Sequence, residues 1–514
     1  MRTISGYQVF AQLIAIASLT ACGGQPEPGQ SESDQTETVT PALTLQQHTA
    51  TCQADPRVVA GIVPLNVCVG AELFLRETFE GNGRTCFTCH RPERNFTIDP
   101  EFIATLPSND PLFVAEFNPV LANLERPEQL RARGLILENV DGTEPDPNVK
   151  FVLRTVPHNL SMGTSIKRPS GSPNPPADRT GWGGDGAPEQ GRLADFIQGA
   201  INQHYPKSLN RVPGVDFRNA TEDERQLVAL FMTELGRKNE IDLNSTPFSD
   251  SGAETGRQRF LTVGCNGCHR NAGANTGGSN QNRNFDIGSE TTRNAALSSF
   301  PLDGGFGALP ANSDGSFGDG TFNSPPLIEA ADTGPFYHTD TTIQGAPKHN
   351  TPSAVTIEQA TAFYATPAFA NSPAGGGSPL PINGTDIDNI GRFLRALNAV
   401  FNIQISIKRV LGARELGNHF QNGEIALQNR LLVLAREELD DALDDLTHAV
   451  GGTLNGSAQN WLGQARGFIN TALGSTQFGV RMQAMGDAFN RLDLADSSIS
   501  ANINFNIGPS NLMD

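Results

Sequence analysis

Two short stretches, TCFTCH at Thr85–His90 and GCNGCH at Gly264–His269, constrain this chain more than any other feature of its sequence. Both contain the pattern Cys-x-x-Cys-His. A helix-forming stretch and a glycine precede each copy, in GAELFLRETFEGNGRTC and in SGAETGRQRFLTVGC. A pattern that recurs with the same flanking order is typical of repeated modules. The sequence therefore predicts two diverged copies of one structural unit.

The residue types in both copies match the attachment signature of c-type haem. Two cysteines at this spacing can add to the two vinyl groups of a porphyrin as thioethers, and the adjacent histidine can then reach the iron. A zinc half-site and a thioredoxin-like dithiol are the alternatives for one isolated Cys-x-x-Cys. Two copies that both carry the trailing histidine favour two covalently bound haem c groups. The expected attachment residues and iron ligands are Cys86, Cys89, His90, Cys265, Cys268 and His269.

Length and composition limit the fold class and the partners. A chain of 514 residues is too long for one small core, which suggests several domains. The formal net charge of −18 argues against nucleic acid as a partner. Strand signals are scarce, and 53 glycines and 34 prolines indicate long loops. We expect a mainly α-helical protein in which long loops pack on large cofactors.

The first residues have the features of an export signal. Val9–Leu19 is a short apolar run after Arg2, and it leads into the letters TAC, which end at Cys22. Small residues before a cysteine resemble the lipobox of bacterial lipoproteins, which implies cleavage before Cys22 and lipid on its sulfur. Gly23 in place of aspartate favours the outer membrane. An ordinary signal peptide is the alternative, and both interpretations send the chain to an oxidising compartment, the periplasm or the cell surface.

Two cysteines remain once the motifs and Cys22 are set aside. Cys52 and Cys68 are an even pair in an exported chain, which predicts a disulfide between them. We expect this bond to be a structural staple.

The rest of the sequence divides into segments of different character. Residues 23–45 are rich in Pro, Gly, Ser, Gln and acidic residues, which predicts a disordered tether. Glu424–Val450 carries leucines at helical spacing, and Gly451 and Gly452 end that pattern. The expected organisation is a lipoprotein signal peptide (1–21), a tether (22–45), two cytochrome c-like haem domains (46–245 and 246–405) and a helical extension (406–514).

Beyond the two motifs, the chain resembles the bacterial di-haem cytochrome c peroxidase superfamily, which includes the MauG-type enzymes and, more distantly, the rubber oxygenases. LRTVPHNL is similar to the family's Arg-Asn-x-Pro-x-Leu region, and GWGGDGAPEQGRLADFIQGAI to its Trp-Asp-Gly segment. FNSPPLIEAADTGPFYHTDTTI is similar to its Thr-Pro-x-Leu…Pro-Tyr-Phe-His-Asp-Gly segment. The similarity covers residues 65–400. It implies an enzyme that reduces hydrogen peroxide with electrons from a small exported redox protein such as cytochrome c.

The resemblance also implies roles for individual residues. Trp182 matches a tryptophan that lies between the two haems and couples them, and a packing role is the alternative. Tyr364 lies where the peroxidases have a methionine ligand of the second iron and the MauG-type enzymes have a tyrosine. It is therefore a candidate ligand of that iron, and a tyrosine packed in a helix is the alternative. His338 matches a family histidine that is usually structural.

The chain departs from the family at two places. No histidine lies between His90 and His158, where the peroxidases carry a releasable ligand of the first iron. The neighbourhood of the family's catalytic glutamate reads INQHYPKSLNR, in which His204 is the candidate for moving a proton between the two oxygens of peroxide.

These departures leave two other functions open. One is an oxidase or oxygenase of the MauG or rubber-oxygenase kind, which would use peroxide or oxygen. The other is an electron carrier without a substrate. Calcium is a further candidate cofactor, and the lipid anchor would make a membrane one of the partners.

Overall fold

The computed structural model is mainly α-helical, as the sequence predicts. It describes residues 43–139, 151–166, 192–277, 283–305, 320–337, 341–349, 351 and 354–514. Within these residues the strands form two short antiparallel pairs. Ala42–Asp514 forms one compact unit. The expected signal peptide, Cys22 and most of the tether lie outside the described residues, as do Trp182 and His338.

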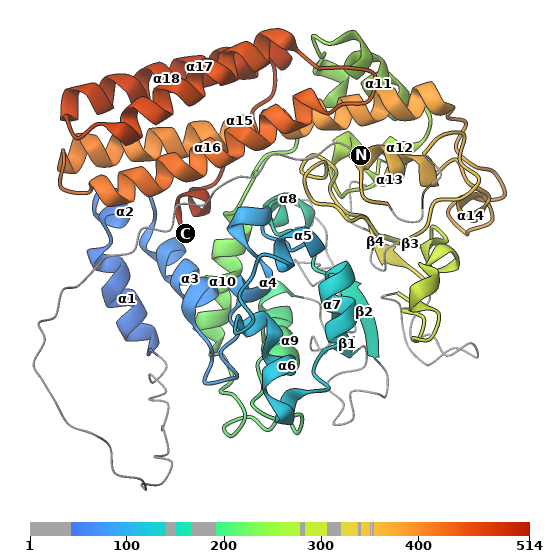
Figure 1. The fold of residues 1–514 in the computed structure, drawn as a ribbon, viewed down its shortest axis with the longest axis horizontal. Coiled ribbons are helices and arrows are strands. Elements are labelled where there is room, and N and C mark those ends of the chain that lie inside the picture. Colours follow the sequence, from blue (N-terminus) through green and yellow to red (C-terminus); the bar gives the residue numbers. More distant parts are fainter. Residues whose placement is uncertain are drawn as a thin grey trace, which may run out of the picture. The chain divides into compact units, whose positions relative to one another are not determined.

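The first motif lies in a group of mostly short helices that precede residue 245 (Figure 1). Strand β1 (Leu135–Asn139) pairs antiparallel with β2 (Phe151–Thr155) in this part of the chain. The helices are α1 (Leu45–Ala54), α2 (Pro56–Val59), α3 (Leu65–Arg76), α4 (Cys86–Cys89), α5 (Pro100–Ile103), α6 (Val114–Phe117), α7 (Pro127–Arg133), α8 (Met162–Ser165), α9 (Leu193–His204) and α10 (Glu222–Thr233).

The second motif lies in a part of the chain that consists largely of loops. Strands β3 (Asn284–Phe285) and β4 (Phe322–Asn323) form the second antiparallel pair. The helices are α11 (Ser251–Thr262), α12 (Cys265–Cys268), α13 (Ile357–Phe363) and α14 (Pro367–Ala370), with a short 3₁₀ turn η5 (Arg270–Ala272) after the motif.

Each motif follows a helix that packs very closely against a later helix. In α3, a Cβ atom added at Gly70 would lie 2.1 Å from the carbonyl oxygen of Leu227 in α10. In α11, a Cβ atom added at Gly256 would lie 1.8 Å from the carbonyl oxygen of Asn389 in the helix that begins at Gly384. Only glycine permits such an approach of two backbones. The helix before each motif therefore has the same kind of close contact, a glycine against the backbone of a later helix.

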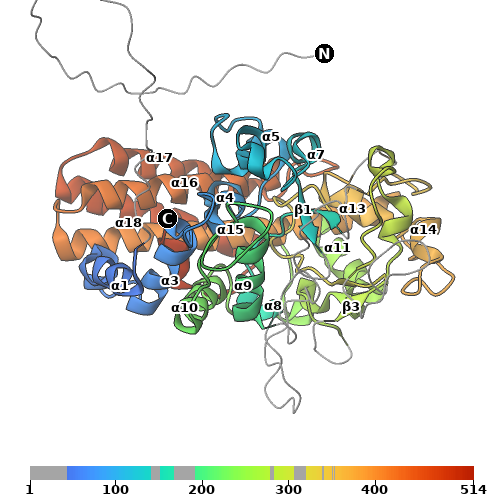
Figure 2. The same ribbon diagram turned by 90° about the horizontal axis from the view of Figure 1, so that it is seen from below.

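Four long helices complete the chain: α15 (Gly384–Phe420), α16 (Ile425–Thr447), α17 (Gly456–Gly474) and α18 (Phe478–Ile499). They pack side by side in both views (Figure 1, Figure 2). The expected boundary at 405/406 falls inside α15, so the helical extension shares its first helix with the segment before it. Among the described residues, no helix combines the length and the apolar composition that crossing a membrane requires.

The last residues of the chain return to the first half of the molecule. The turn η8 (Pro509–Leu512) follows α18, and the Ser510 hydroxyl donates to the Phe231 carbonyl of α10 at 2.8 Å. Arg57 donates to the Leu512 carbonyl at 2.8 Å. Cys52 of α1 and Cys68 of α3 form a disulfide nearby in the sequence, which joins these two helices. The helical extension is thus anchored to the part of the chain that carries the first motif.

Candidate functional site

The two motifs adopt the same local structure. The cysteines of each copy begin and end a single helical turn, α4 or α12, so residues i and i+3 lie on one side of it. The histidine follows at once, and its backbone N–H donates to the first cysteine's carbonyl, at 3.0 Å for His90 and 2.9 Å for His269. Two thiols and one imidazole are therefore presented together in each copy.

The copies differ in how this turn begins. Thr85 starts the first turn with a reciprocal hydrogen-bonding pattern that involves Thr88. Gly264 starts the second with φ of +116°, which is a conformation that favours glycine. The backbone conformation before the turn therefore differs between the two copies, although the turn itself is the same.

Both imidazoles are held in one orientation by a backbone carbonyl. His90 Nδ1 lies 3.0 Å from the Phe96 oxygen, and His269 Nδ1 lies 2.9 Å from the Pro325 oxygen. A carbonyl only accepts, so Nδ1 carries the proton and Nε2 keeps its lone pair. Burial lowers the pKa of both histidines to about 4, so both are neutral at physiological pH. A neutral imidazole whose other nitrogen donates to a carbonyl is the usual arrangement of a metal ligand.

The four motif cysteines are free thiols, and each is half-buried. Burial raises the pKa of Cys86 to about 11, and those of Cys89 and Cys265 to about 12. A redox-active dithiol needs a lowered pKa, because the thiolate is the reacting form. Within the described residues, no group of three or more His, Cys, Asp or Glu side chains is placed to hold a metal ion. The raised thiol pKa values give no support to a redox-active dithiol.

His204 and Tyr205 bring the end of α9 to the first motif. The Tyr205 hydroxyl donates to Cys86 Sγ at 3.3 Å. His204 Nε2 lies 3.9 Å from a carboxylate oxygen of Glu138. Burial lowers the pKa of His204 to about 3, and the positive charges of Arg84 and Arg211 act in the same direction, as would a proton on His90. His204 is thus a neutral proton acceptor in the electrostatic neighbourhood of His90.

His158 is a second histidine near the first motif. It lies between β2 and α8, and the backbone N–H of Leu160 donates to its Nδ1 at 3.4 Å. Burial and the charge of Arg237 lower its pKa to about 4, and a charge on His158 in turn disfavours protonation of His90. The structure therefore groups three histidines around the first motif, two of them from sequence more than 60 residues away.

The second motif is surrounded by phenols instead. Tyr364 follows α13, and burial, with the neighbouring Cys265 and Cys268, raises its pKa well above the ordinary value. The Tyr337 hydroxyl, which donates to the Ala360 carbonyl at 2.8 Å, influences the titration of Tyr364 and is influenced by it. The structure thus brings Tyr364 next to the second pair of cysteines as a neutral phenol.

Several residues of these surroundings were not predicted as site residues. Tyr205 directly follows His204, and Tyr337 directly precedes His338, so both lie in stretches that the sequence analysis quotes. The position of Tyr205 and Tyr337 next to a candidate histidine in the sequence could have indicated that they lie near the site. A buried ion pair between Arg237 and Glu329 had no comparable signal, because its partners are far apart in the sequence.

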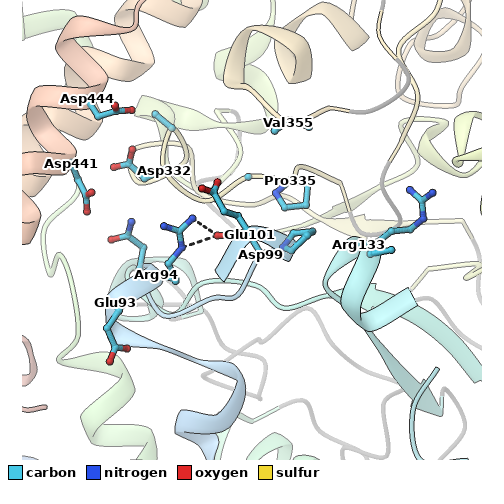
Figure 3. Close-up of a pocket in the computed structure, with 15 residues that line it drawn as sticks. Glu93, Arg94, Asp99, Glu101, Arg133, Asp332, Pro335, Val355, Asp441 and Asp444 are labelled. Carbon is cyan, nitrogen blue, oxygen red and sulfur yellow. Dashed lines mark hydrogen bonds and ion pairs between the residues drawn. The ribbon is translucent and has the colours of Figure 1, made fainter. Parts of the chain in front are cut away.

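A separate cavity of about 620 Å³ lies beside the loop that follows the first motif (Figure 3). Asp332, Asp441 and Asp444 line it from one side, and Arg94, which is paired with Asp99, lies opposite. Burial and the neighbouring carboxylates Asp332 and Glu438 raise the pKa of Asp441 to about 9. The cavity is therefore acidic in composition and partly protonated at neutral pH.

No family model matches this chain, and no curated protein sequence matches it. Among solved structures, the chain is similar to hydrazine synthase from Kuenenia stuttgartiensis, pressurised with 20 bar xenon, at 12% sequence identity. The similarity covers 72% of this chain and 99% of that chain, with a TM-score of 0.34. A likeness at this TM-score is too weak to carry a conclusion about this chain.

Proposed function

We propose that this chain is an exported di-haem c-type oxidoreductase that reduces hydrogen peroxide with electrons from a small redox protein. The observation that carries the proposal is the matched geometry of the two motifs. In each, two thiols share one helical turn, and a neutral imidazole is held through Nδ1 with its Nε2 lone pair available. A single motif of this kind has several explanations, but two copies with the same imidazole orientation favour haem attachment.

The residues present fit two haem c groups. Cys86 and Cys89 would hold the first group and Cys265 and Cys268 the second, while His90 and His269 would each supply one nitrogen ligand to the iron. Haem, when bound, supplies an iron that changes oxidation state and a conjugated edge that exchanges electrons. The thioether bonds keep the group attached even where that edge is exposed.

Peroxide reduction breaks the O–O bond and consumes two electrons and two protons to give two waters. In this proposal His204 moves a proton from one peroxide oxygen to the other. At a pKa of about 3 the imidazole is neutral before peroxide binds, so it starts in the form that accepts a proton. Arg84, which is buried and paired with Glu125 at 2.8 Å, contributes positive charge on the same side.

Electron supply is assigned to the second group, with Trp182 as the coupling residue between the two. The donor would be a small c-type cytochrome or a similar exported protein. Export and attachment to the outer membrane through lipid on Cys22 belong to the same proposal. They rest on the sequence features of residues 1–22.

A second candidate function is an oxidase or oxygenase that stores oxidising equivalents on both groups. The observation in its favour is the phenol pair beside the second motif, Tyr364 and Tyr337. A phenolate ligand would stabilise the oxidised iron and disfavour simple electron entry. In the described structure Tyr364 is protonated, so ligation would require loss of that proton.

The experiment is expression of the full chain in a host that matures c-type cytochromes. We expect two haems per chain by the pyridine haemochrome assay, retained after denaturation, and steady turnover of peroxide with reduced cytochrome c. Absence of covalent haem would overturn the proposal. Two haems without peroxide turnover but with uptake of oxygen would favour the oxidase, and two inert six-coordinate irons would leave an electron carrier.

A further inference from the structure

The C-terminal end of α9 carries the two residues that reach the first motif. Helix α9 ends at His204, and Tyr205 follows it directly. The last carbonyl groups of a helix have no partner within that helix. Pro206 has no N–H group with which the chain could extend the helix. These carbonyls therefore need donors from another part of the chain or from water.

Asn82 supplies the donors. Its Nδ2 donates to the His204 carbonyl at 2.9 Å and to the Pro206 carbonyl at 3.1 Å. Its backbone N–H donates to the Tyr205 carbonyl at 2.8 Å. Three consecutive carbonyls thus bind to one half-buried residue, which lies just before the first motif.

The residues on both sides of Asn82 permit this contact. A Cβ atom added at Gly81 would lie 2.2 Å from the Tyr205 carbonyl oxygen, so a larger residue could not approach so closely. Gly83 has φ of +94°, a conformation that favours glycine. Asn82 Oδ1 accepts from the Arg84 backbone N–H at 3.1 Å, which turns Nδ2 toward the carbonyls at the end of α9. The amide of Asn82 is therefore held in one orientation.

The same segment fixes what α9 brings to the first motif. The Tyr205 side chain is buried, and its hydroxyl donates to Cys86 Sγ at 3.3 Å. A thioether sulfur is a weak acceptor, so attachment of Cys86 to a porphyrin would leave this donor a partner. Arg84, whose charge acts on His204, lies two residues after Asn82. One short loop thus sets the backbone of His204, the contact of Tyr205 and the nearby positive charge.

The end of the corresponding helix at the second motif is held differently. Tyr364 follows α13 and also lies beside its pair of cysteines. Its carbonyl accepts from the Leu380 backbone N–H at 2.9 Å. That donor comes from a part of the chain well after the second motif, whereas Asn82 comes directly before the first.

We infer that Asn82 is a positioning residue for peroxide reduction, which holds His204 in place beside the first motif. The inference rests on the proposed function, in which His204 moves a proton between the two peroxide oxygens. Such a group has to lie within hydrogen-bond reach of the oxygen that gives up the proton. Asn82 acts through the backbone of residues 204–206. A displacement of about 1 Å in such a group can lower the rate by about 10²-fold.

The test uses the full-length holoprotein and the variant Asn82→Ala. We expect two haems per chain and a fall in kcat/KM for peroxide of about 10²-fold. The absorption spectrum of the first haem should also shift, because the phenol beside the attached sulfur loses its support. The matched control is Asn118→Ala, which removes an asparagine whose Oδ1 accepts from the Val120 backbone N–H at 3.1 Å, at the start of η3 (Pro119–Leu121). The control should leave kcat/KM and the spectrum unchanged.

A double-mutant cycle separates positioning from a general loss of structure. In the His204→Gln background, Asn82→Ala should lower kcat/KM little further, because the group that it positions is already absent. An equal further loss in that background would overturn the inference, as would an unchanged kcat/KM in folded Asn82→Ala.

A second variant serves if Asn82→Ala does not fold. Asn82→Ser keeps an oxygen that can accept from the Arg84 N–H, but its side chain is too short to reach both carbonyls. It enters the same cycle with the same two criteria. Absence of covalent haem or of peroxide turnover in the natural chain would instead refute the proposed function, so the two failures are distinguishable.

Discussion

The surroundings of the first and second motifs differ far more than the motifs themselves. Both turns present two thiols and a neutral imidazole in the same way. Around the first, the chain gathers His158, His204 and the charge of Arg84. Around the second, it gathers the phenols of Tyr364 and Tyr337. Local sequence thus determines the turn that presents the thiols and the imidazole, whereas segments distant in sequence determine what surrounds it.

Removing the cysteines of one motif at a time tests this comparison most severely. We expect Cys86→Ser/Cys89→Ser and Cys265→Ser/Cys268→Ser each to retain one covalent haem, because the two turns are built separately. The reduced form of the second variant should react rapidly with one equivalent of peroxide. The first variant should react about 10²-fold more slowly or worse, because it lacks the site beside His204. Stopped-flow absorbance measures both, and equal rates would show that the two sites share one role.

Substitutions of His204 and Tyr364 should separate the roles of the two surroundings. We expect His204→Gln to lower kcat/KM for peroxide by about 10²–10⁴-fold, since it removes the proton acceptor near the first motif. We expect Tyr364→Phe to leave that constant within about threefold and to change the absorption spectrum of the second haem only. Steady-state kinetics and spectra of each separate haem check this pair. A reversed pattern would exchange the roles assigned to the two sites.

The glycines before the motifs offer a matched pair of structural substitutions. We expect Gly70→Ala and Gly256→Ala each to lower the free energy of unfolding by about 1–3 kcal/mol, because the added methyl group forces two backbones apart. Gly463→Ala, in exposed surroundings of α17 with open space at its Cβ position, is the control and should be neutral or stabilising. Thermal or denaturant unfolding measures all three. Tolerance of the change at only one motif would mean that the two halves are not packed alike.

Local patterns predicted the helical parts of this fold well. The leucine spacing of Glu424–Val450 and the following glycines predict α16, and Leu431, Leu434 and Leu439 are buried there. The boundary at 405/406 was not a structural break. Residues 384–420 contain no proline, so nothing in the local sequence interrupts α15. A boundary placed where the character of the sequence changes therefore fell inside one continuous helix.

The sequence predicted only those parts of the candidate site whose residues are close together along the chain. Both Cys-x-x-Cys-His turns follow from six consecutive residues. The contact between Tyr205 and Cys86 spans 119 residues, and the Arg237–Glu329 pair spans 92. Such pairs are set by how the helices and loops pack, and no periodicity in the sequence encodes them. The roles of His204 and Tyr364 stay predictions, although the structure places each beside the expected motif.

The acidic cavity lies between the loop after the first motif, the segment around Asp332 and helix α16. Asp441 has a pKa raised to about 9, first by burial and then by the nearby Asp332 and Glu438. In the unfolded chain its pKa would be about 4. The folded state therefore binds a proton that the unfolded state releases, and stability falls as pH rises from about 4 towards about 9.

Asp441→Asn removes this proton uptake, and its stabilising effect should depend on pH. We expect the variant to raise the free energy of unfolding by about 1–3 kcal/mol at pH 8 and to change it little at pH 4. Asp493→Asn, on the exposed surface of α18, is the control and should stay within about 0.5 kcal/mol at both pH values. Denaturant unfolding at the two pH values measures these effects. If Asp441→Asn changed the free energy of unfolding equally at both pH values, Asp441 would not be the group that makes stability depend on pH.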